Sequence, residues 1–173
     1  MIGKKMQDAI NEQIKEELGS AYLYLSMEAF FSSKGLDGMA HWMRCQTQEE
    51  MMHAMKLYDS VVERDGRVEL LALDKPQMDW KSPLAAFQAA YKHEQFITDR
   101  INGLVSLANK ENDNASAIML HWFVTEQVEE EASTSKVAQD LEIAGDSGQG
   151  ILMLDRELGA RIPIVTLPAA GGE

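Results

Sequence analysis

Apolar residues recur at steps of four and three along four long stretches of the chain, which is the period of one face of an α-helix. Each face carries polar or acidic residues at its centre, where further apolar side chains are expected. The four series are Ile10, Ile14, Glu17, Ala21, Tyr24; Met39, Met43, Gln46, Glu50, His53, Leu57; Phe87, Tyr91, Glu94, Thr98, Ile101; and Leu120, Phe123, Gln127, Glu130, Thr134, Val137, Leu141. The pattern predicts an all-α, four-helix bundle with carboxylates inside its core.

Capping and helix-breaking residues set the expected ends of these helices. Asp37 is the expected cap of the second helix, Ser82 precedes Pro83 at the start of the third, and Asn112 or Asp113 opens the fourth. The helices are expected over residues 6–33, 37–64, 83–109 and 113–145. A glycine-rich hinge, 145–150, then precedes a short fifth helix over 151–158.

The connection between the second and third helices determines the expected topology. The second helix is about 42 Å long at 1.5 Å per residue, and the extended segment 66–82 can span about 56 Å. Bundle connections are usually about 2–8 residues. A long crossover therefore joins two helical hairpins, and the sequence is expected to form a four-helix bundle over 6–145 within one domain over 1–160. Residues 161–173 are expected to form a flexible tail.

The charge balance restricts the partners of the protein. A formal net charge of −12 over 173 residues argues against a nucleic-acid partner, because binding to phosphate requires basic surfaces. No stretch is long and apolar enough for a membrane span or a secretory leader, so neither a membrane partner nor export is expected and the expected location is cytoplasmic. The single cysteine, Cys45, excludes an intrachain disulfide and thiolate-rich zinc sites.

The buried carboxylates predict a metal centre. Four acidic residues inside one small bundle are strongly destabilising unless a cation lies among them. Glu50 and His53 are three residues apart, so they project from one helix face toward a common point. Carboxylate oxygens with one imidazole suit iron or manganese rather than structural zinc. The most direct interpretation is a pair of metal ions.

Several sequence segments together resemble the bacterial and archaeal non-haem ferritins, across about residues 3–160. They are Asn11-Glu-Gln, Tyr22-Leu-Tyr24, Gln48-Glu-Glu-Met-x-His53, Tyr91-Lys-His-Glu94, and Trp122-Phe-Val-Thr-Glu-Gln-Val-Glu-Glu-Glu131. Ferritin-like carboxylate proteins can place Glu-x-x-His on two helices. This chain has Gln127-x-x-Glu130 on its fourth helix instead, which leaves one histidine and a second metal position richer in oxygen ligands.

The resemblance implies a ferritin-like fold and a role for each inward polar residue. Glu17, Glu50 and His53 are expected to hold one iron ion, with Glu50 bridging to a second ion held by Glu94 and Glu130. Gln127 lines the pair, and Tyr24 matches a tyrosine near the centre. Glu49, Glu126 and Glu129 match a third, weaker iron position. A solvated run of charges formed by Glu126, Glu129 and Glu131 on the fourth helix is the open alternative to the third iron position. For Tyr24 the alternative is a core aromatic residue.

The resemblance also implies an activity. Two Fe(II) ions per subunit are expected to be oxidised by dioxygen or hydrogen peroxide, and Fe(III) is expected to collect as an oxyhydroxide mineral. Storage requires a hollow homo-oligomer, by resemblance a 24-subunit cage. Haem is not expected, because relatives that bind it carry Glu-x-x-His on the fourth helix; Met51 is expected to be a packing residue.

Three other functions remain open at the level of sequence. A substrate oxygenase or manganese enzyme can use the same bundle. A DNA-protecting mini-ferritin places its ligands between subunits and usually adds a basic tail, whereas this chain ends in Gly-Gly-Glu. A structural cage subunit lacks the inward carboxylates that are present here.

Overall fold

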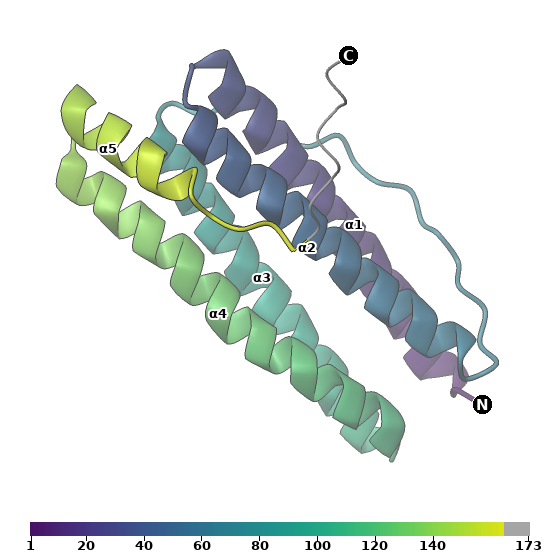
Figure 1. The fold of residues 1–173 in the computed structure, drawn as a ribbon. Coiled ribbons are helices and arrows are strands. Elements are labelled where there is room, and N and C mark those ends of the chain that lie inside the picture. The colour runs from purple at the N-terminus through teal and green to yellow at the C-terminus, as the bar shows by residue number, and fades with distance from the viewer. Residues whose placement is uncertain (165–173) are drawn as a thin grey trace.

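The computed structural model describes residues 1–164, which form five α-helices (Figure 1). The helices are α1 (Lys4–Ser33), α2 (Asp37–Val62), α3 (Pro83–Lys110), α4 (Asn114–Ala144) and α5 (Gly148–Leu158). The predicted fold class is confirmed, including the long crossover after α2 and the short fifth helix. Residues 165–173, most of the expected tail, lie outside the described residues.

The third and fourth helices begin at the caps that the sequence predicts. The Ser82 hydroxyl accepts a hydrogen bond from the Ala85 amide at 3.1 Å, and the Asp113 carboxylate accepts one from the Ser116 amide at 3.1 Å. Each satisfies an amide that has no partner within its own helix. These side chains therefore fix where the second hairpin starts and turns.

The second helix is capped differently from the prediction. Asp37 is its first helical residue, Leu36 occupies the cap position, and no side chain there accepts a bond. The carboxylate of Asp155, in α5, accepts the Met39 amide at 2.8 Å instead. The prediction that Asp37 caps α2 is wrong, because a distant residue satisfies the free amide.

The fifth helix begins three residues earlier than expected. The Ser147 hydroxyl accepts a bond from the Gly150 amide at 3.2 Å, which supports a helical turn at Gly148. The interruption between α4 and α5 is therefore short. Gly145 ends α4 with a positive φ of 54°, a conformation that glycine adopts without steric cost.

The two hairpins lie side by side, and the crossover runs along the outside of α1 and α2 (Figure 1). The Asn11 side chain donates to the Arg67 carbonyl at 3.1 Å, and the Ser26 hydroxyl donates to the Gln77 carbonyl at 2.6 Å. These bonds attach the crossover to α1 at two separated points. The third helix consequently starts at the far end of the bundle.

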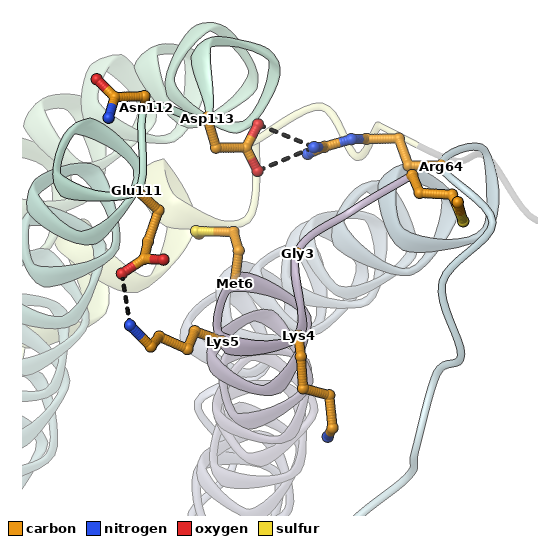
Figure 2. Close-up of a pocket in the computed structure, with 9 residues that line it drawn as sticks. Gly3, Lys4, Lys5, Met6, Arg64, Glu111, Asn112 and Asp113 are labelled. Atoms are coloured by element: carbon orange, nitrogen blue, oxygen red, sulfur yellow. Dashed lines mark hydrogen bonds and ion pairs between the residues drawn. The ribbon is translucent and has the colours of Figure 1, made fainter.

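Ion pairs join the hairpins at the opposite end (Figure 2). Both carboxylate oxygens of Asp113 accept from the Arg64 guanidinium at 2.9 Å, and Lys5 pairs with Glu111 at 2.9 Å. In the Arg64 pair one nitrogen, Nη2, donates to both carboxylate oxygens and the pair is largely shielded from solvent, whereas Lys5 is mostly exposed. The first pair therefore contributes more to holding this end together.

A polar layer divides the hydrophobic core into two parts. One cluster includes Tyr24, Phe31 and Phe87, and the other includes Ile14 and Phe123. Between them lie the buried polar residues Glu17, Gln46, Glu50, His53, Glu94, Gln127, Glu130 and Thr134. The two apolar clusters shield this layer from water on both sides, and the low local dielectric strengthens its electrostatic interactions.

Among residues 1–164, none of the helices combines the length and apolarity that crossing a bilayer requires.

Candidate metal centre

Glu17, Glu50 and His53 form the most compact group of possible ligands. One ligand atom from each lies within 4.8 Å of the others. His53 Nδ1 is 3.3 Å from Glu50 Oε2 and 4.0 Å from Glu17 Oε2. Each residue is at most 1% exposed. Neighbouring turns of α2 supply two of these side chains and α1 supplies the third.

Each of these three residues has a buried polar atom without a hydrogen-bond partner among the described residues. The atoms are Glu17 Oε2, Glu50 Oε1 and His53 Nδ1. Buried polar atoms are normally paired, because an unpaired one loses its solvation without compensation. A cation placed among them satisfies all three at once, so the donor set fits a metal ion.

Glu94 lies on α3 and forms the second side of the centre. Its Oε1 accepts a short hydrogen bond from the Tyr24 hydroxyl, and its Oε2 accepts one from the Gln127 amide at 3.2 Å. Tyr24 and Gln127 thereby hold the carboxylate in one orientation. Tyr24 is also fully buried in the apolar cluster that includes Phe31 and Phe87, so its ring packs in the core while its hydroxyl binds Glu94.

Glu130 completes the inner set from α4. Its Oε2 accepts from the Gln46 amide at 2.7 Å. Gln46 lies one turn before Glu50 on the inward face of α2, so the periodicity identifies it as buried. Its bond to a carboxylate on another helix has no sequence signature.

The carboxyl groups perturb one another. Burial, opposed by the Gln13 amide, raises the pKa of Glu17 to about 7. Burial raises the pKa of Glu94 to about 6. Burial and the charge of Glu94 raise the pKa of Glu130 to about 8. The pKa of Glu50 is raised well above its ordinary range by burial and by the surrounding carboxylates. The metal-free centre therefore retains protons near neutral pH that an incoming cation displaces.

His53 has the opposite behaviour. Burial and the charge of Lys56 lower the pKa of His53 to about 4, so the ring is neutral at pH 7 and has a lone pair available for a metal. The Trp122 and Phe123 rings meet it edge to face at centroid distances of 5.4 and 5.9 Å. This packing restricts the ring to one plane, with Nδ1 toward the carboxylates. Trp122 thus contacts the candidate ligand directly.

The outer carboxylates Glu49, Glu126 and Glu129 line a hollow of about 250 Å³ that also reaches His53 and Glu130. Burial raises the pKa of both Glu49 and Glu126, whereas Glu129 is exposed. The hollow is therefore lined by residues that range from exposed Glu129 to buried His53 and Glu130. The three carboxylates share one hollow, as a third cation position requires, and Glu129 is also in contact with solvent.

Some polar contacts around the centre were not expected from sequence. The Arg161 guanidinium contacts Glu49 at 2.5 Å, whereas the sequence predicts that residue 161 begins a flexible tail. The Arg100 guanidinium donates to Gln13 at 3.0 Å, and Gln13 donates to Glu17 at 2.9 Å. Arg100 and Gln13 are on helical faces and thus detectable as polar neighbours of the core, whereas Arg161 follows the last helix and has no periodic signal.

Met51, which is expected to be a packing residue, lies on the outer surface of the subunit. Its side chain is 44% exposed and lines an apolar surface hollow with Tyr22, Leu25 and Leu73. It contributes to this outer surface rather than to the bundle core, because residue 51 follows the inward Glu50 and points away from it.

The fold and the buried ligands together define a class: a four-helix bundle with a carboxylate-rich centre suited to metal ions. Residues 7–144 match the family model for the ferritin-like domain. The chain belongs to the ferritin family.

Comparisons with individual relatives cover nearly the whole chain. It is 41% identical over 161 residues to a bacterial non-heme ferritin of Bacteroides fragilis, covering 93% of this chain and all of the relative. It is 36% identical to a bacterial non-heme ferritin of Campylobacter jejuni, with 90% and 93% covered. A crystal structure of an open pore ferritin from the archaeon Archaeoglobus fulgidus matches with a TM-score of 0.93 and 50% identity, covering 94% of this chain and 100% of that chain.

Proposed function

We propose that this protein stores iron by oxidising Fe(II) at the intrasubunit centre and retaining Fe(III) as an oxyhydroxide mineral inside a homo-oligomeric cage. The convergence of unpartnered ligand atoms from Glu17, Glu50 and His53 carries the proposal. Membership in the ferritin family supports the same function. The family resemblance supports 24 subunits.

Iron is the substrate in this proposal. Glu17, Glu50 and His53 bind the first Fe(II), and Glu50 also reaches the second, which Glu94 and Glu130 bind. Gln127 and Tyr24 keep Glu94 oriented toward the pair. Because the carboxyl pKa values are raised, binding of two cations releases protons from the centre.

The electron balance requires both ions. Each Fe(II) loses one electron, and dioxygen takes two electrons and two protons to give hydrogen peroxide. With hydrogen peroxide as oxidant, the same two electrons and two protons give two water molecules. Holding the two ions side by side lets one oxidant molecule receive both electrons without release of a one-electron product.

The outer hollow favours this function over oxidation of an organic substrate. Carboxylates from Glu49, Glu126 and Glu129 line it, so it attracts cations rather than an apolar molecule. These residues are proposed to form the third, weaker iron position, through which Fe(III) leaves the pair. The expected cytoplasmic location stays a prediction.

Stopped-flow measurement of Fe(II) oxidation tests the centre. His53→Ala and Glu130→Ala each remove one ligand, so we expect the fast phase to slow by roughly 10–100-fold, while circular dichroism shows an intact bundle. His121→Ala, at an exposed histidine on α4, is the matched control and should oxidise iron at the unaltered rate. Near-normal rates in both ligand variants would overturn the assignment.

Storage needs a separate measurement. After aerobic addition of Fe(II), brown iron should elute with a particle of several hundred kilodaltons in size-exclusion chromatography. Oxidised iron that precipitates or elutes apart from the protein would contradict storage, although oxidation itself had occurred.

A further inference from the structure

Arg161 extends from the segment after α5 into the entrance of the metal centre. Its Nη2 donates to Glu49 Oε2 at 2.5 Å, and its Nη1 donates to Gln46 Oε1. Gln46 in turn donates to Glu130 Oε2 at 2.7 Å. One guanidinium group therefore connects an outer carboxylate to an inner one through a single amide side chain.

The helix α2 holds this arginine in place. The Arg161 guanidinium carbon lies 4.7 Å from the centre of the Trp42 ring, which is a favourable distance for a cation over an aromatic face. The Arg161 carbonyl oxygen lies 2.8 Å from His41 Nε2. The segment that follows α5 lies over α2 in Figure 1. Backbone and side chain are thus both fixed on α2, and the arginine reaches Glu49 from a defined position.

Arg161 places a positive charge where the proposed function expects metal cations to pass. It lines the same hollow as Glu49, Glu126, Glu129 and Glu130, where a cationic substrate is expected to pass. A guanidinium remains positively charged at all physiological pH values and does not leave by losing a proton. It therefore repels any metal ion in the hollow for as long as it is bound to Glu49.

We propose that Arg161 is a built-in competitor for the outer cation position: it neutralises Glu49 until a metal ion binds there, and the ion must displace it. This inference rests on the proposed function. Displacement lowers the affinity of the outer position, because the arginine contact with Glu49 is lost when the ion binds. Weak binding at the outer position allows an ion to move on. Among residues 1–164, no arginine or lysine forms an ion pair with the inner carboxylates Glu17, Glu50, Glu94 or Glu130 in the same way.

Titration with Zn²⁺, a redox-inert divalent ion, tests the competition directly. Isothermal titration calorimetry of the assembled protein should resolve two tighter binding events per subunit and a weaker third event. In Arg161→Gln the third event should become on the order of tenfold tighter, equal to about 1.4 kcal/mol. Arg161→Lys keeps the charge but loses the planar fork, so it should give a smaller gain. A gain in affinity distinguishes competition from a supporting role, whose removal weakens binding.

Two controls locate the effect. Arg67→Gln removes the same charge from an exposed crossover residue whose backbone binds Asn11 and Gln7, and it should leave all three events unaltered. In a Glu49→Gln background, Arg161→Gln should no longer give any gain, because the competed carboxylate is absent. Size-exclusion chromatography of each variant verifies that the assembly is intact.

The outcomes separate this inference from the function on which it rests. If the two tight events are present but the affinity of the third event is unchanged or weakened in both Arg161→Gln and Arg161→Lys, the competition alone is overturned. A gain that persists in the Glu49→Gln background overturns it as well. Absence of the two tight events from the unaltered protein overturns the proposed function and this inference together.

Discussion

Gly38, in the first turn of α2, lies directly against the backbone of Asp155 in α5. A methyl group at residue 38 would lie 1.6 Å from the Asp155 carbonyl oxygen and 3.0 Å from the Gly159 amide nitrogen. The same Asp155 accepts the Met39 amide through its side chain at 2.8 Å. The carboxylate thereby satisfies and stabilises the positive end of the α2 dipole. This close contact is what places α5, and hence Arg161, over the second helix.

Gly38→Ala should therefore displace α5. Overpacking against backbone costs about 1–3 kcal/mol, which corresponds to a melting temperature lower by roughly 2–12 °C. Calorimetry measures the shift, and limited proteolysis at 145–147 reports release of the helix. Gly103→Ala is the matched control: a methyl group there meets nothing within 4 Å among the described residues, and alanine should stabilise α3 by up to about 1 kcal/mol. Equal behaviour of the two variants would contradict the docking argument.

The exposed face of α5 should support assembly rather than the fold of one subunit. Leu152 and Met153 are 53% and 70% exposed, and an apolar face on so short a helix suits contact with other copies. Leu152→Glu with Met153→Glu should lower the fraction of assembled cages and the iron retained per particle, while initial Fe(II) oxidation continues. Gln139→Glu adds a charge at an exposed polar position of α4 as a control. Full cages with full iron loading in the double variant would mean that this face has no closing role.

Glu94→Gln should weaken the stabilisation that metal ions give. At a hundredfold excess over Kd, one ion bound only to the folded state adds about 2.7 kcal/mol, or roughly 5–11 °C in melting temperature. The variant should lose much of this gain. Its metal-free form should be as stable as the unaltered protein or more stable, because one charge is removed from a repelling group. Glu142→Gln, at an exposed site of α4, is the control and should preserve the full gain in melting temperature. If Zn²⁺ does not raise the melting temperature of the unaltered protein, a buried metal centre is refuted.

The stability of the metal-free protein should fall as pH rises from 6.5 to 8. The folded-state pKa values of Glu17 and Glu130, about 7 and 8, exceed the ordinary 4.5, so the folded protein holds protons that the unfolded chain has released. Their stabilising contribution is complete below pH 4.5 and is lost as pH rises through the folded values. His53, lowered to about 4, acts oppositely and only below about 6.5.

Thermal denaturation at several pH values, with and without Zn²⁺, measures this linkage. The gain in melting temperature from Zn²⁺ should increase from pH 6.5 to 8, because fewer protons compete for the carboxylates. Glu130→Gln should flatten the metal-free profile over the same range. A metal-free stability that rises between pH 6.5 and 8 would contradict the raised pKa values.

Periodicity is sufficient to predict the bundle and the inward carboxylates at its centre. A helix repeats every 3.6 residues, so the positions of Glu17, Glu50, Glu94 and Glu130 relative to apolar neighbours specify which face each occupies. The cap at Ser82 and the length of the crossover are likewise local properties. Their prediction required no knowledge of contacts between distant residues.

The sequence by itself determined the helices, the topology of two hairpins, and the residues that face the core, because each follows from local spacing and chain length. Only the tertiary structure decided which ligand atoms lack partners, how Gln46 orients Glu130, and that Asp155 rather than Asp37 caps α2. It also decided that Arg161 reaches Glu49, 112 residues earlier in the chain. Such contacts depend on how separate helices dock, and docking is set by close backbone approaches such as that of Gly38 to Asp155, which leave no periodic pattern in the sequence.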